Sequence, residues 1–400
     1  MVIELIIALL LGVICGTFTG LAPGIHINLV AAILLFSLDK FQSIPFIALA
    51  VFIVAMSITH TFIDFVPSIF LGAPDEDSAL SVLPGHQLLL EGRGYEAFIL
   101  TLYGSLFAIL IILLFSPVFT FALPYFYNLI KDFMPFLLIF ISIYIILRED
   151  DFLISFFVFI LAGFLGIASF NTPVKEPLLP LLSGLFGLST LFMSLKSKTI
   201  PKKQKIFPLK KIKLEKKGFF KSAFAAAIFA PLCSFLPGIG SSHAATLGSE
   251  FIGQDRKGFL FMVGACNTII MGLSYVAVYA IGKSRTGTAA AVKSLLPSFS
   301  QSDLIILIGA IVISGILSFF LGIFVSRIFA KFMNKINYKY LTIGVITVVI
   351  SVNIFFTNWL GLIILVSSTA LGIYVVESGS RRINLMASLI FPAIIYYLTN

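Results

Sequence analysis

The stretch GLAPGIHIN, residues 20–28, interrupts an apolar region with a Pro-Gly pair, and FLPGIGSSH, residues 235–243, repeats this pattern half a chain later. Proline lacks a backbone N–H and clashes with the preceding helical turn, whereas glycine permits a chain reversal. The apolar segments that follow, residues 25–38 and 240–253, are too short to cross a bilayer. The sequence therefore predicts two helices that break inside the membrane and return as short second legs.

Apolar segments make up most of the chain. Charged residues account for 11% of the 400 residues and hydrophobic residues for 59%, with a mean hydropathy of +1.09. A water-soluble globule of this size cannot bury so much apolar surface. We expect an all-α polytopic membrane protein with about 12–14 membrane segments, which excludes a soluble enzyme, a secreted scaffold and a nucleic-acid-binding protein. The expected spans are residues 3–22, 45–71, 96–117, 133–147, 152–170, 176–195, 219–236, 258–282, 303–329, 339–356, 359–376 and 383–399.

The order of these segments is the same in the two halves of the chain. Each half has a broken helix, a long apolar segment, a polar turn at Gly72 or Gly282, a further span and a set of three helices. An odd number of crossings in each half inverts the second half relative to the first. We expect two inverted structural repeats, at residues 1–195 and 222–400, joined by a basic linker at 196–221. Inverted repeats with broken helices are typical of secondary transporters, whose substrate sites lie at the repeat interface.

The basic linker, residues 196–221, carries the positive charge of the chain. It holds eleven lysines and one acid, Glu215, so its charge of +10 exceeds the net charge of +9 of the whole chain. By the positive-inside rule we expect this loop in the cytoplasm and the protein in the cell membrane with many crossings. Binding of the lysines to anionic lipid is the alternative interpretation.

Polar residues beside the two breaks are the candidate substrate-binding groups. A helix that restarts after a break presents unpaired backbone N–H groups and the positive end of its dipole, which suits an anion. Alternatively, the hydroxyl and amide side chains only cap the second legs. The candidates are Pro23, Gly24, His26 and Asn28 at the first break and Pro237, Gly238, Ser241, Ser242 and His243 at the second.

Thr59, His60 and Asp64 are the candidate ion-coupling residues, because they lie within the otherwise apolar run 45–71. A carboxylate inside a membrane span is costly unless it is paired or functional, and carboxylates and histidines form the usual proton and cation relays. His60 and Asp64 are four residues apart and therefore share a helix face. The alternative is a structural polar pair between helices. The counterpart run in the second half offers the uncharged Asn267 as a further oxygen ligand or hydrogen-bonding group.

The two polar turns carry opposite charges. Asp75, Glu76 and Asp77 occupy the first turn, whereas Lys283 and Arg285 lie in the second. If both turns reach the repeat interface, the basic pair neutralises an anionic substrate and the acidic group holds a cation. Ordinary solvated loops are the alternative, above all for the acidic turn.

Three motifs extend the pattern around the breaks: GTFTGLAPGI (16–25), LPGHQLLLEGRGYEA (83–97) and LPGIGSSHAATLGSEF (236–251). With these motifs the chain resembles, over nearly its full length, the large membrane subunit of the tripartite tricarboxylate transporters, in a divergent archaeal-type form. The resemblance implies a permease driven by an ion gradient, with a small membrane subunit and an extracytoplasmic binding protein as partners. Carried over by position, it implies that Pro23, Gly24, Pro237, Gly238 and Asn267 frame the substrate site.

These observations together predict an ion-coupled secondary transporter that moves an organic anion, a di- or tricarboxylate, by alternating access. We expect Na⁺ or H⁺ as the coupling ion, and no cofactor, metal centre or nucleic-acid partner. The alternative is an intramembrane enzyme or translocator that acts on a lipid-phosphate substrate, because the same anion-binding breaks suit a phosphate headgroup.

Overall fold

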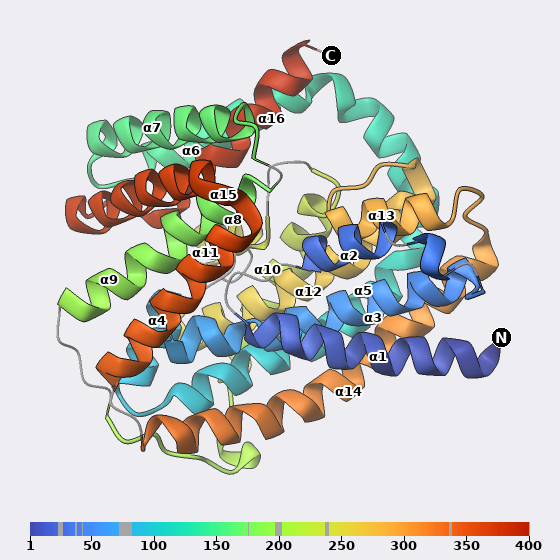
Figure 1. Ribbon diagram of the computed structural model, residues 1–400, viewed down its shortest axis with the longest axis horizontal. Coiled ribbons are helices and arrows are strands. Elements are labelled where there is room, and N and C mark those ends of the chain that lie inside the picture. Colours follow the sequence, from blue (N-terminus) through green and yellow to red (C-terminus); the bar gives the residue numbers. More distant parts are fainter. Residues whose placement is uncertain are drawn as a thin grey trace.

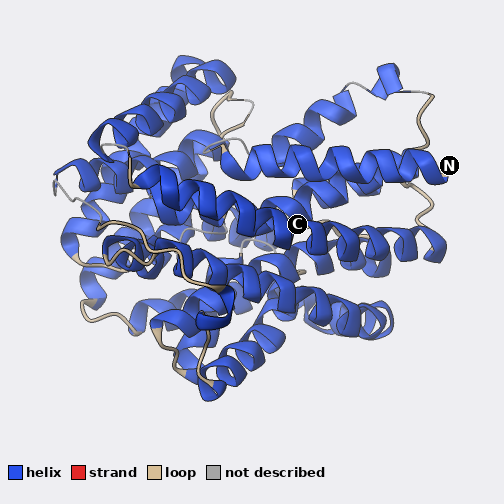
Figure 2. Ribbon diagram, turned by 90° about the horizontal axis from the view of Figure 1, so that it is seen from below, coloured by secondary structure: helices blue, strands red, loops and turns tan. Residues whose placement is uncertain are grey.

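Helices make up nearly all of the regular structure of the protein. The computed structural model describes residues 1–22, 27–36, 38–41, 43–71, 82–174, 176–196, 202–236, 240–335 and 338–399. No strand occurs within these ranges, as Figure 2 shows. The described part of the chain has nine helical segments long and apolar enough to cross a membrane. The expected class, an all-α polytopic membrane protein, is therefore confirmed.

Nine segments are fewer than the 12–14 expected, because two of the nine each contain two expected spans and the helix over the expected span 219–236 is not among them. The segment Gly94–Leu147 contains the two expected spans 96–117 and 133–147 in 54 residues, and Lys339–Ser378 contains two more in 40 residues. Proline rings at Pro117 and Pro124 lie inside the first of these long helices without ending it.

The described part of the first half contains four helices of 18 residues or more, several shorter ones and two π-helical turns. Its elements are α1 (Val2–Leu21), α2 (Ile27–Phe36), η1 (Leu38–Phe41), α3 (Phe46–Ile63), the π-helical η2 (Pro67–Leu71), α4 (Val82–Leu90), α5 (Gly94–Ile130), η4 (Lys131–Phe133), α6 (Met134–Leu147), α7 (Phe152–Phe170), α8 (Leu178–Leu182), the π-helical η5 (Ser183–Leu188) and α9 (Ser189–Lys196).

The second half begins with the same order of long and short helices as the first. Its elements are α10 (Lys216–Cys233), α11 (Ser241–Ile252), α12 (Arg256–Ile281), α13 (Gly287–Leu295), α14 (Gln301–Met333), α15 (Tyr338–Ser378), η7 (Arg382–Met386) and α16 (Ala387–Thr399), preceded in the linker by η6 (Leu209–Lys211). The short helices α4 and α13 occupy corresponding places after the two polar turns, and the sequence did not predict either. The inverted repeats themselves stay a prediction.

Helices α3 and α12 form the centre of the molecule. In their most apolar stretches 83% of the residues of the α3–η2 segment and 94% of those of α12 are buried, against 28% for α1 and 39% for α14. Figure 1 shows α1, α3 and α14 running side by side, with α5 and α12 behind them. The peripheral helices therefore present their apolar side chains outward to lipid, and the few polar groups of α3 and α12 lie inside the protein.

Glycines allow the central helices to approach closely. On α1, Gly12, Gly16 and Gly20 recur every four residues and face α3, where a Cβ on Gly12 would lie 2.6 Å from the Phe52 carbonyl oxygen. Between α5 and α12, a Cβ on Gly104 would overlap the Phe261 carbonyl oxygen. Small residues at such spacing are the usual means of close helix packing in membranes.

A second group of helices, here called the peripheral lobe, consists of α6, α7, α8, η5, α9, α15, η7 and α16 and occupies the left side and the top of Figure 1. Helix α15 has two legs, because Asn358 adopts a left-handed conformation with φ of 60°. This break falls in the link that the sequence predicts between spans 339–356 and 359–376. Gly166 of α7 lies against the Ser388 backbone of α16, and Gly184 lies against α15.

The described part of the basic linker is held against the ends of the core helices. Lys205 N–H donates to the Gly92 carbonyl at 2.8 Å, and the Gln204 amide donates to the Leu89 carbonyl at 2.8 Å. Asn334, at the end of α14, accepts from the Gln204 N–H at 2.6 Å. The linker, the α4–α5 turn and the end of α14 therefore lie on one face of the protein, here called the charged face.

Candidate functional site

Asp64 lies where α3 is interrupted, in the centre of the protein. Its N–H donates to the His60 carbonyl at 2.9 Å, so it closes the last turn of α3. Pro67 cannot donate a hydrogen bond to the Ile63 carbonyl, and this explains why the regular helix stops here and a π-helical turn follows. The side chain of Asp64 is 2% exposed. The sequence therefore produces a buried carboxylate at a helix break.

Asp64 contacts the second half of the chain directly. The Asn267 amide of α12 donates to Asp64 Oδ2 at 2.8 Å, and the hydroxyls of Thr61 and Thr268 lie 3.0 Å apart. All four side chains are buried. Asp64 follows Thr61 on α3, whereas its partner Asn267 precedes Thr268 on α12. The two helices therefore run antiparallel, as inversion of the second half requires. The sequence analysis named Asp64 and Asn267 separately, and the structure brings them together.

His60 and Thr59 contact two other helices. His60 Nδ1 lies 3.1 Å from the Thr19 hydroxyl of α1, and the Ser318 hydroxyl of α14 donates to Thr59 Oγ1 at 2.8 Å. His60 and Asp64 therefore lie on one face of α3 but contact different neighbours. Sequence reasoning missed Thr19 and Ser318, although both are hydroxyl side chains in otherwise apolar helices. Together these residues form a buried polar layer through α1, α3, α12 and α14.

The N-terminal turn of α11 holds three of the candidate substrate residues. Ser241, Ser242 and His243 are all buried, and the Gly240 N–H donates to His243 Nδ1 at 3.2 Å. Gly240 occupies the N-cap position, so neither serine is the N-cap residue that the alternative interpretation requires. Helix α11 packs against α10 and α12. The turn therefore places backbone N–H groups and two hydroxyls beside the central helix α12.

The second leg of the first break packs against the basic turn of the other half. The Thr288 N–H, in the first turn of α13, donates to the Asn28 carboxamide oxygen at 3.2 Å. The Tyr275 hydroxyl of α12 donates to Thr288 Oγ1 at 3.2 Å, and Thr286 caps α13 by accepting from the Ala289 N–H at 3.1 Å. Asn28 therefore joins α2 of the first half to α13 of the second. Sequence reasoning did not single out Tyr275 or Thr288.

Lys283 and Arg285 differ in their surroundings. Lys283 is exposed beside Gly282, which ends α12 in the left-handed conformation with φ of 63°. Arg285 is half-buried, and its Nη1 atom is buried with no hydrogen-bond partner among the described residues. Of these two side chains, Arg285 is the one that has a buried N–H group available to a substrate anion.

Several candidates lie outside the described residues. These are Pro23, Gly24 and His26 at the first break, Pro237 and Gly238 at the second, and Asp75, Glu76 and Asp77 in the acidic turn. Their predicted roles stay predictions.

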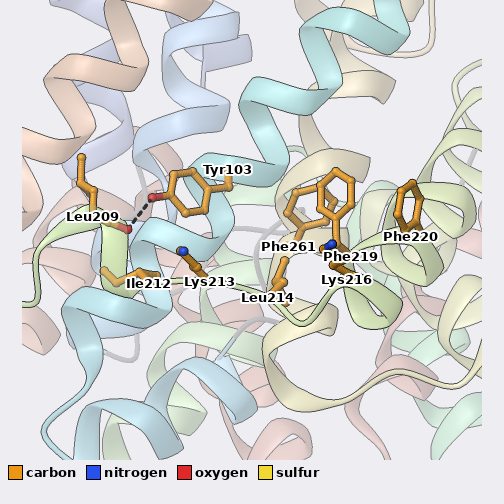
Figure 3. Close-up of a pocket in the computed structure, with 9 residues that line it drawn as sticks. All are labelled: Tyr103, Leu209, Ile212, Lys213, Leu214, Lys216, Phe219, Phe220 and Phe261. Carbon is orange, nitrogen blue, oxygen red and sulfur yellow. Dashed lines mark hydrogen bonds between the residues drawn. The ribbon is translucent and has the colours of Figure 1, made fainter.

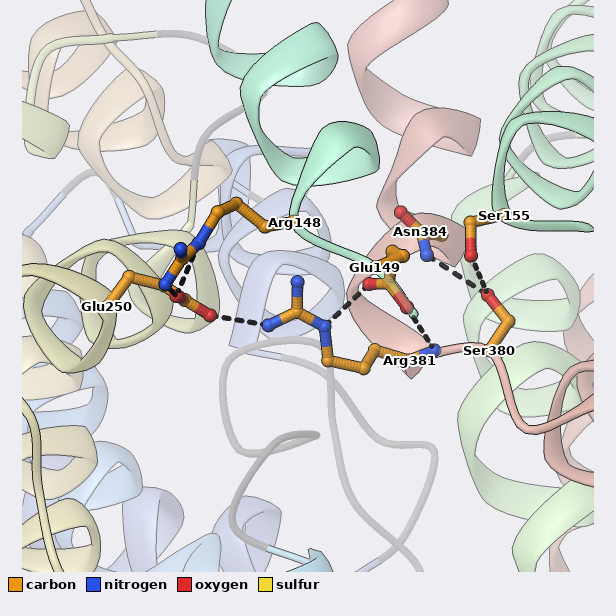
Figure 4. Close-up of polar contacts among 7 residues, drawn as sticks. All are labelled: Arg148, Glu149, Ser155, Glu250, Ser380, Arg381 and Asn384. Carbon is orange, nitrogen blue, oxygen red and sulfur yellow. Dashed lines mark hydrogen bonds and ion pairs between the residues drawn. The ribbon is translucent and has the colours of Figure 1, made fainter. Parts of the chain in front are cut away.

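The C-terminal end of α11 is tied to the peripheral lobe by ion pairs (Figure 4). Glu250 pairs with Arg148 at 2.7 Å and with Arg381 at 2.5 Å, and Arg381 also pairs with Glu149 at 2.6 Å. Burial by itself raises the pKa of the Glu250 carboxyl, but the hydrogen bonds from the two arginines outweigh it and hold that pKa below its ordinary value. These ion pairs fix α11 to the loop between α6 and α7 and to the start of η7.

Comparison with known families identifies the chain. Residues 6–387 match the Tripartite tricarboxylate transporter TctA family. The chain belongs to the TctA family. It is 33% identical over 403 residues to "Uncharacterized protein MJ1079" of Methanocaldococcus jannaschii, and the match covers 98% of each chain. No solved structure gives a significant match.

Membership of the TctA family confirms the resemblance that the motifs around the two breaks indicated. The chain is a multi-pass membrane protein and a permease of the tripartite tricarboxylate type, and it belongs among transporters rather than enzymes. The family acts together with partner proteins in tripartite systems.

Proposed function

We propose that this TctA permease is an ion-coupled secondary transporter that moves a di- or tricarboxylate across the membrane by alternating access. The observation that carries the proposal is the hydrogen bond of 2.8 Å between Asp64 of α3 and Asn267 of α12. It puts a carboxylate in the buried centre of the protein, where two antiparallel helices from the two halves meet. A carboxylate in this position is costly unless it binds an ion or a proton during function.

The coupling ion, Na⁺ or H⁺, binds at Asp64. The break at Pro67 leaves main-chain carbonyl groups beside the carboxylate outside the regular helical ladder, and such groups serve as cation ligands in transporters with broken helices. The hydroxyls of Thr61 and Thr268 lie 3.0 Å apart on the same two helices and add neutral oxygens. His60 and Thr59 orient α3 against α1 and α14 through their hydroxyl contacts.

The substrate anion binds between the second legs of the two broken helices. The first turn of α11 offers N–H groups and the hydroxyls of Ser241 and Ser242, and the positive end of the α11 dipole points the same way. On the other side, Arg285 offers a buried Nη1 donor next to the contact between α2 and α13. A guanidinium suits a planar carboxylate because it donates two parallel hydrogen bonds.

Alternating access follows from a rocking of one half of the core against the other about the α3–α12 contact. The ion pairs of Glu250 with Arg148 and Arg381 join α11 to the peripheral lobe and stabilise the conformation described here. We infer that these pairs separate when the transporter opens to the opposite side. The charged face, which carries the basic linker, is cytoplasmic by the positive-inside rule. A small membrane subunit and an extracytoplasmic binding protein deliver the substrate to the other face.

Reconstitution of the purified chain tests this function. Proteoliposomes are loaded with buffer, an inward Na⁺ or H⁺ gradient is imposed, and uptake of labelled di- and tricarboxylates is measured with and without the subunits that co-purify. Gradient-dependent carboxylate uptake supports the proposal, and the gradient that drives it names the ion. Carboxylate flux unaffected by either gradient contradicts ion coupling. Transbilayer movement of labelled phospholipid without carboxylate uptake favours the lipid-phosphate alternative.

A further inference from the structure

A pocket of about 420 Å³ lies beneath the basic linker, away from the buried polar layer. Pockets that hold small organic ligands have volumes of about 300–1,000 Å³, so this one is large enough for a phosphate group and part of an acyl chain. Its walls come from the linker, from α5, from the start of α10 and from α12 (Figure 3). The residues that line it are Tyr103, Leu209, Ile212, Lys213, Leu214, Lys216, Phe219, Phe220 and Phe261.

The inner wall of the pocket is a fixed aromatic cluster. The ring centroids of Phe219 and Phe261 lie 5.3 Å apart at an angle of 65°, and Phe107 contacts Phe261 from behind at 5.7 Å. Edge-to-face and tilted ring packing at these distances holds the rings in defined positions. The Tyr103 hydroxyl donates to the Leu209 carbonyl at 3.3 Å and so fastens the linker over the opening. The pocket is therefore preformed by contacts among its own walls.

Positive charge surrounds the opening of this apolar pocket. Lys213 and Lys216 line the pocket and are exposed, and in the view of Figure 3 Lys213 lies below Tyr103 and Lys216 below Phe219. The whole linker has eleven lysines against the single acid Glu215. An apolar wall with a cationic rim is complementary to a molecule that has an anionic head and a hydrocarbon tail.

The pocket lies between the charged linker and the apolar helices. Helix α10 begins at Lys216 and continues into an apolar segment, so charged residues precede the pocket along this helix and apolar residues follow it. Phe220, at its edge, is 68% exposed, as expected for an aromatic side chain that contacts lipid. Lysines beside a membrane segment on the cytoplasmic side attract anionic lipids.

We propose that this pocket binds one anionic phospholipid, with its phosphate held by Lys213 and Lys216 and an acyl chain against Phe219, Phe220 and Phe261. The site goes beyond the transport function, because none of these residues is among the candidate substrate-binding or ion-coupling residues. The bound lipid joins the linker to α5, α10 and α12. It thereby fixes the connection between the two halves of the permease to the membrane surface.

The test compares two variants with equal loss of charge. The full-length protein is purified in a neutral detergent, and binding of phosphatidylglycerol is measured by native mass spectrometry and by titration. The double variant K213Q/K216Q removes the two lysines of the pocket, and we expect at least a tenfold loss of affinity. The matched control K210Q/K211Q removes two exposed lysines of the same linker that do not line the pocket, and we expect less than a twofold change.

A third variant tests the pocket without changing charge. Leu214→Trp fills the cavity and is expected to abolish binding of phosphatidylglycerol while the melting temperature without lipid stays unchanged. If Leu214→Trp destabilises the fold, the comparison of the two lysine variants decides alone. Equal losses of affinity in K213Q/K216Q and K210Q/K211Q would mean that the linker lysines attract anionic lipid without a defined site. That result overturns the proposal. Equal binding of zwitterionic phosphatidylcholine also overturns it, because that result means that the site does not select an anionic phospholipid.

Discussion

Replacement of Asp64 by asparagine is the most informative single change in the protein. The side chain keeps its size, and Asn267 can still donate to the remaining carboxamide oxygen over the present 2.8 Å. A hydrogen bond to a charged group contributes about 1.5–3 kcal/mol and a neutral one about 1 kcal/mol, so the fold loses about 1 kcal/mol. A permease of this size with a buried core tolerates such a loss, and Asp64→Asn is expected to purify as a monodisperse protein.

The effect on ion binding is much larger than the effect on stability. A carboxylate and a monovalent cation about 3 Å apart attract each other by about 5 kcal/mol at an effective dielectric constant of about 20. Desolvation of the two charges cancels much of this attraction, and a net loss of about 2 kcal/mol corresponds to about 30-fold weaker ion binding. Coupled uptake by Asp64→Asn at a fixed ion concentration is therefore expected to fall by at least this factor.

The assay is initial-rate uptake of labelled carboxylate into proteoliposomes under an imposed ion gradient. Ser142→Ala serves as a matched control, because the buried Ser142 hydroxyl of α6 donates to the Leu138 carbonyl at 2.8 Å and α6 packs against α7 and α16 in the peripheral lobe. The control is expected to retain uptake within about twofold, since a single neutral hydrogen bond contributes about 1 kcal/mol. Wild-type uptake by well-folded Asp64→Asn would refute the role of this carboxylate.

Three further predictions concern packing, the ion pairs and topology. Gly104→Ala places a Cβ against the Phe261 carbonyl and is expected to cost about 2–3 kcal/mol of unfolding free energy, whereas Gly309→Ala, with open space around it, changes the melting temperature little. Glu250→Gln is expected to lower stability by about 1 kcal/mol at neutral pH. The ion pairs hold the pKa of Glu250 below its ordinary value of 4.5. Their contribution to the melting temperature is therefore complete above pH 4.5 and is lost as the pH falls through the lowered pKa of Glu250. A cysteine at Lys211 is expected to react with an impermeant thiol reagent only from the cytoplasmic side, and labelling from outside intact cells would reverse the topology.

The helices of the protein could be predicted because their sequence signals are local. Long apolar runs and Pro-Gly pairs act within a few residues, so the expected spans match α1, α7, α12 and α14 closely. The short second legs α2 and α11 also begin where the sequence predicts. Helices α4 and α13 were missed, because nine residues of mixed polarity give no clear periodicity and their place depends on packing against other elements.

The contacts of the candidate site could not be predicted in the same way. Asp64 and Asn267 are each unusual in an apolar run, but their separation of 203 residues means that only the packing of α3 on α12 pairs them. Thr19 was missed although a signal existed: Gly12, Gly16 and Gly20 mark the face of α1 that contacts α3. A polar residue beside such glycines is buried between helices, and this rule identifies Thr19 as a partner for α3.

Ion pairs on the charged face depend on loops that are distant in the sequence. Glu91 pairs with Arg256 at 2.8 Å, and the hydrogen bond from Arg256 lowers the pKa of the Glu91 carboxyl. This contact puts the α4–α5 turn and the start of α12 on the same face of the protein. Which charged residues pair on this face depends on how the ends of the helices are arranged in three dimensions, and this arrangement cannot be read from the sequence.

The central claim is that ion and anion movements are coupled through this chain, and reciprocity tests it most directly. Coupling requires that a carboxylate gradient drive the ion, just as an ion gradient drives the carboxylate. Proteoliposomes are given an inward gradient of the transported carboxylate with no ion gradient, and ion uptake is followed with ²²Na⁺ and with a pH-sensitive dye. Uptake of one of these ions above its electrochemical equilibrium, absent with Asp64→Asn, is the predicted result. Carboxylate entry without any accumulation of Na⁺ or H⁺ would contradict the account.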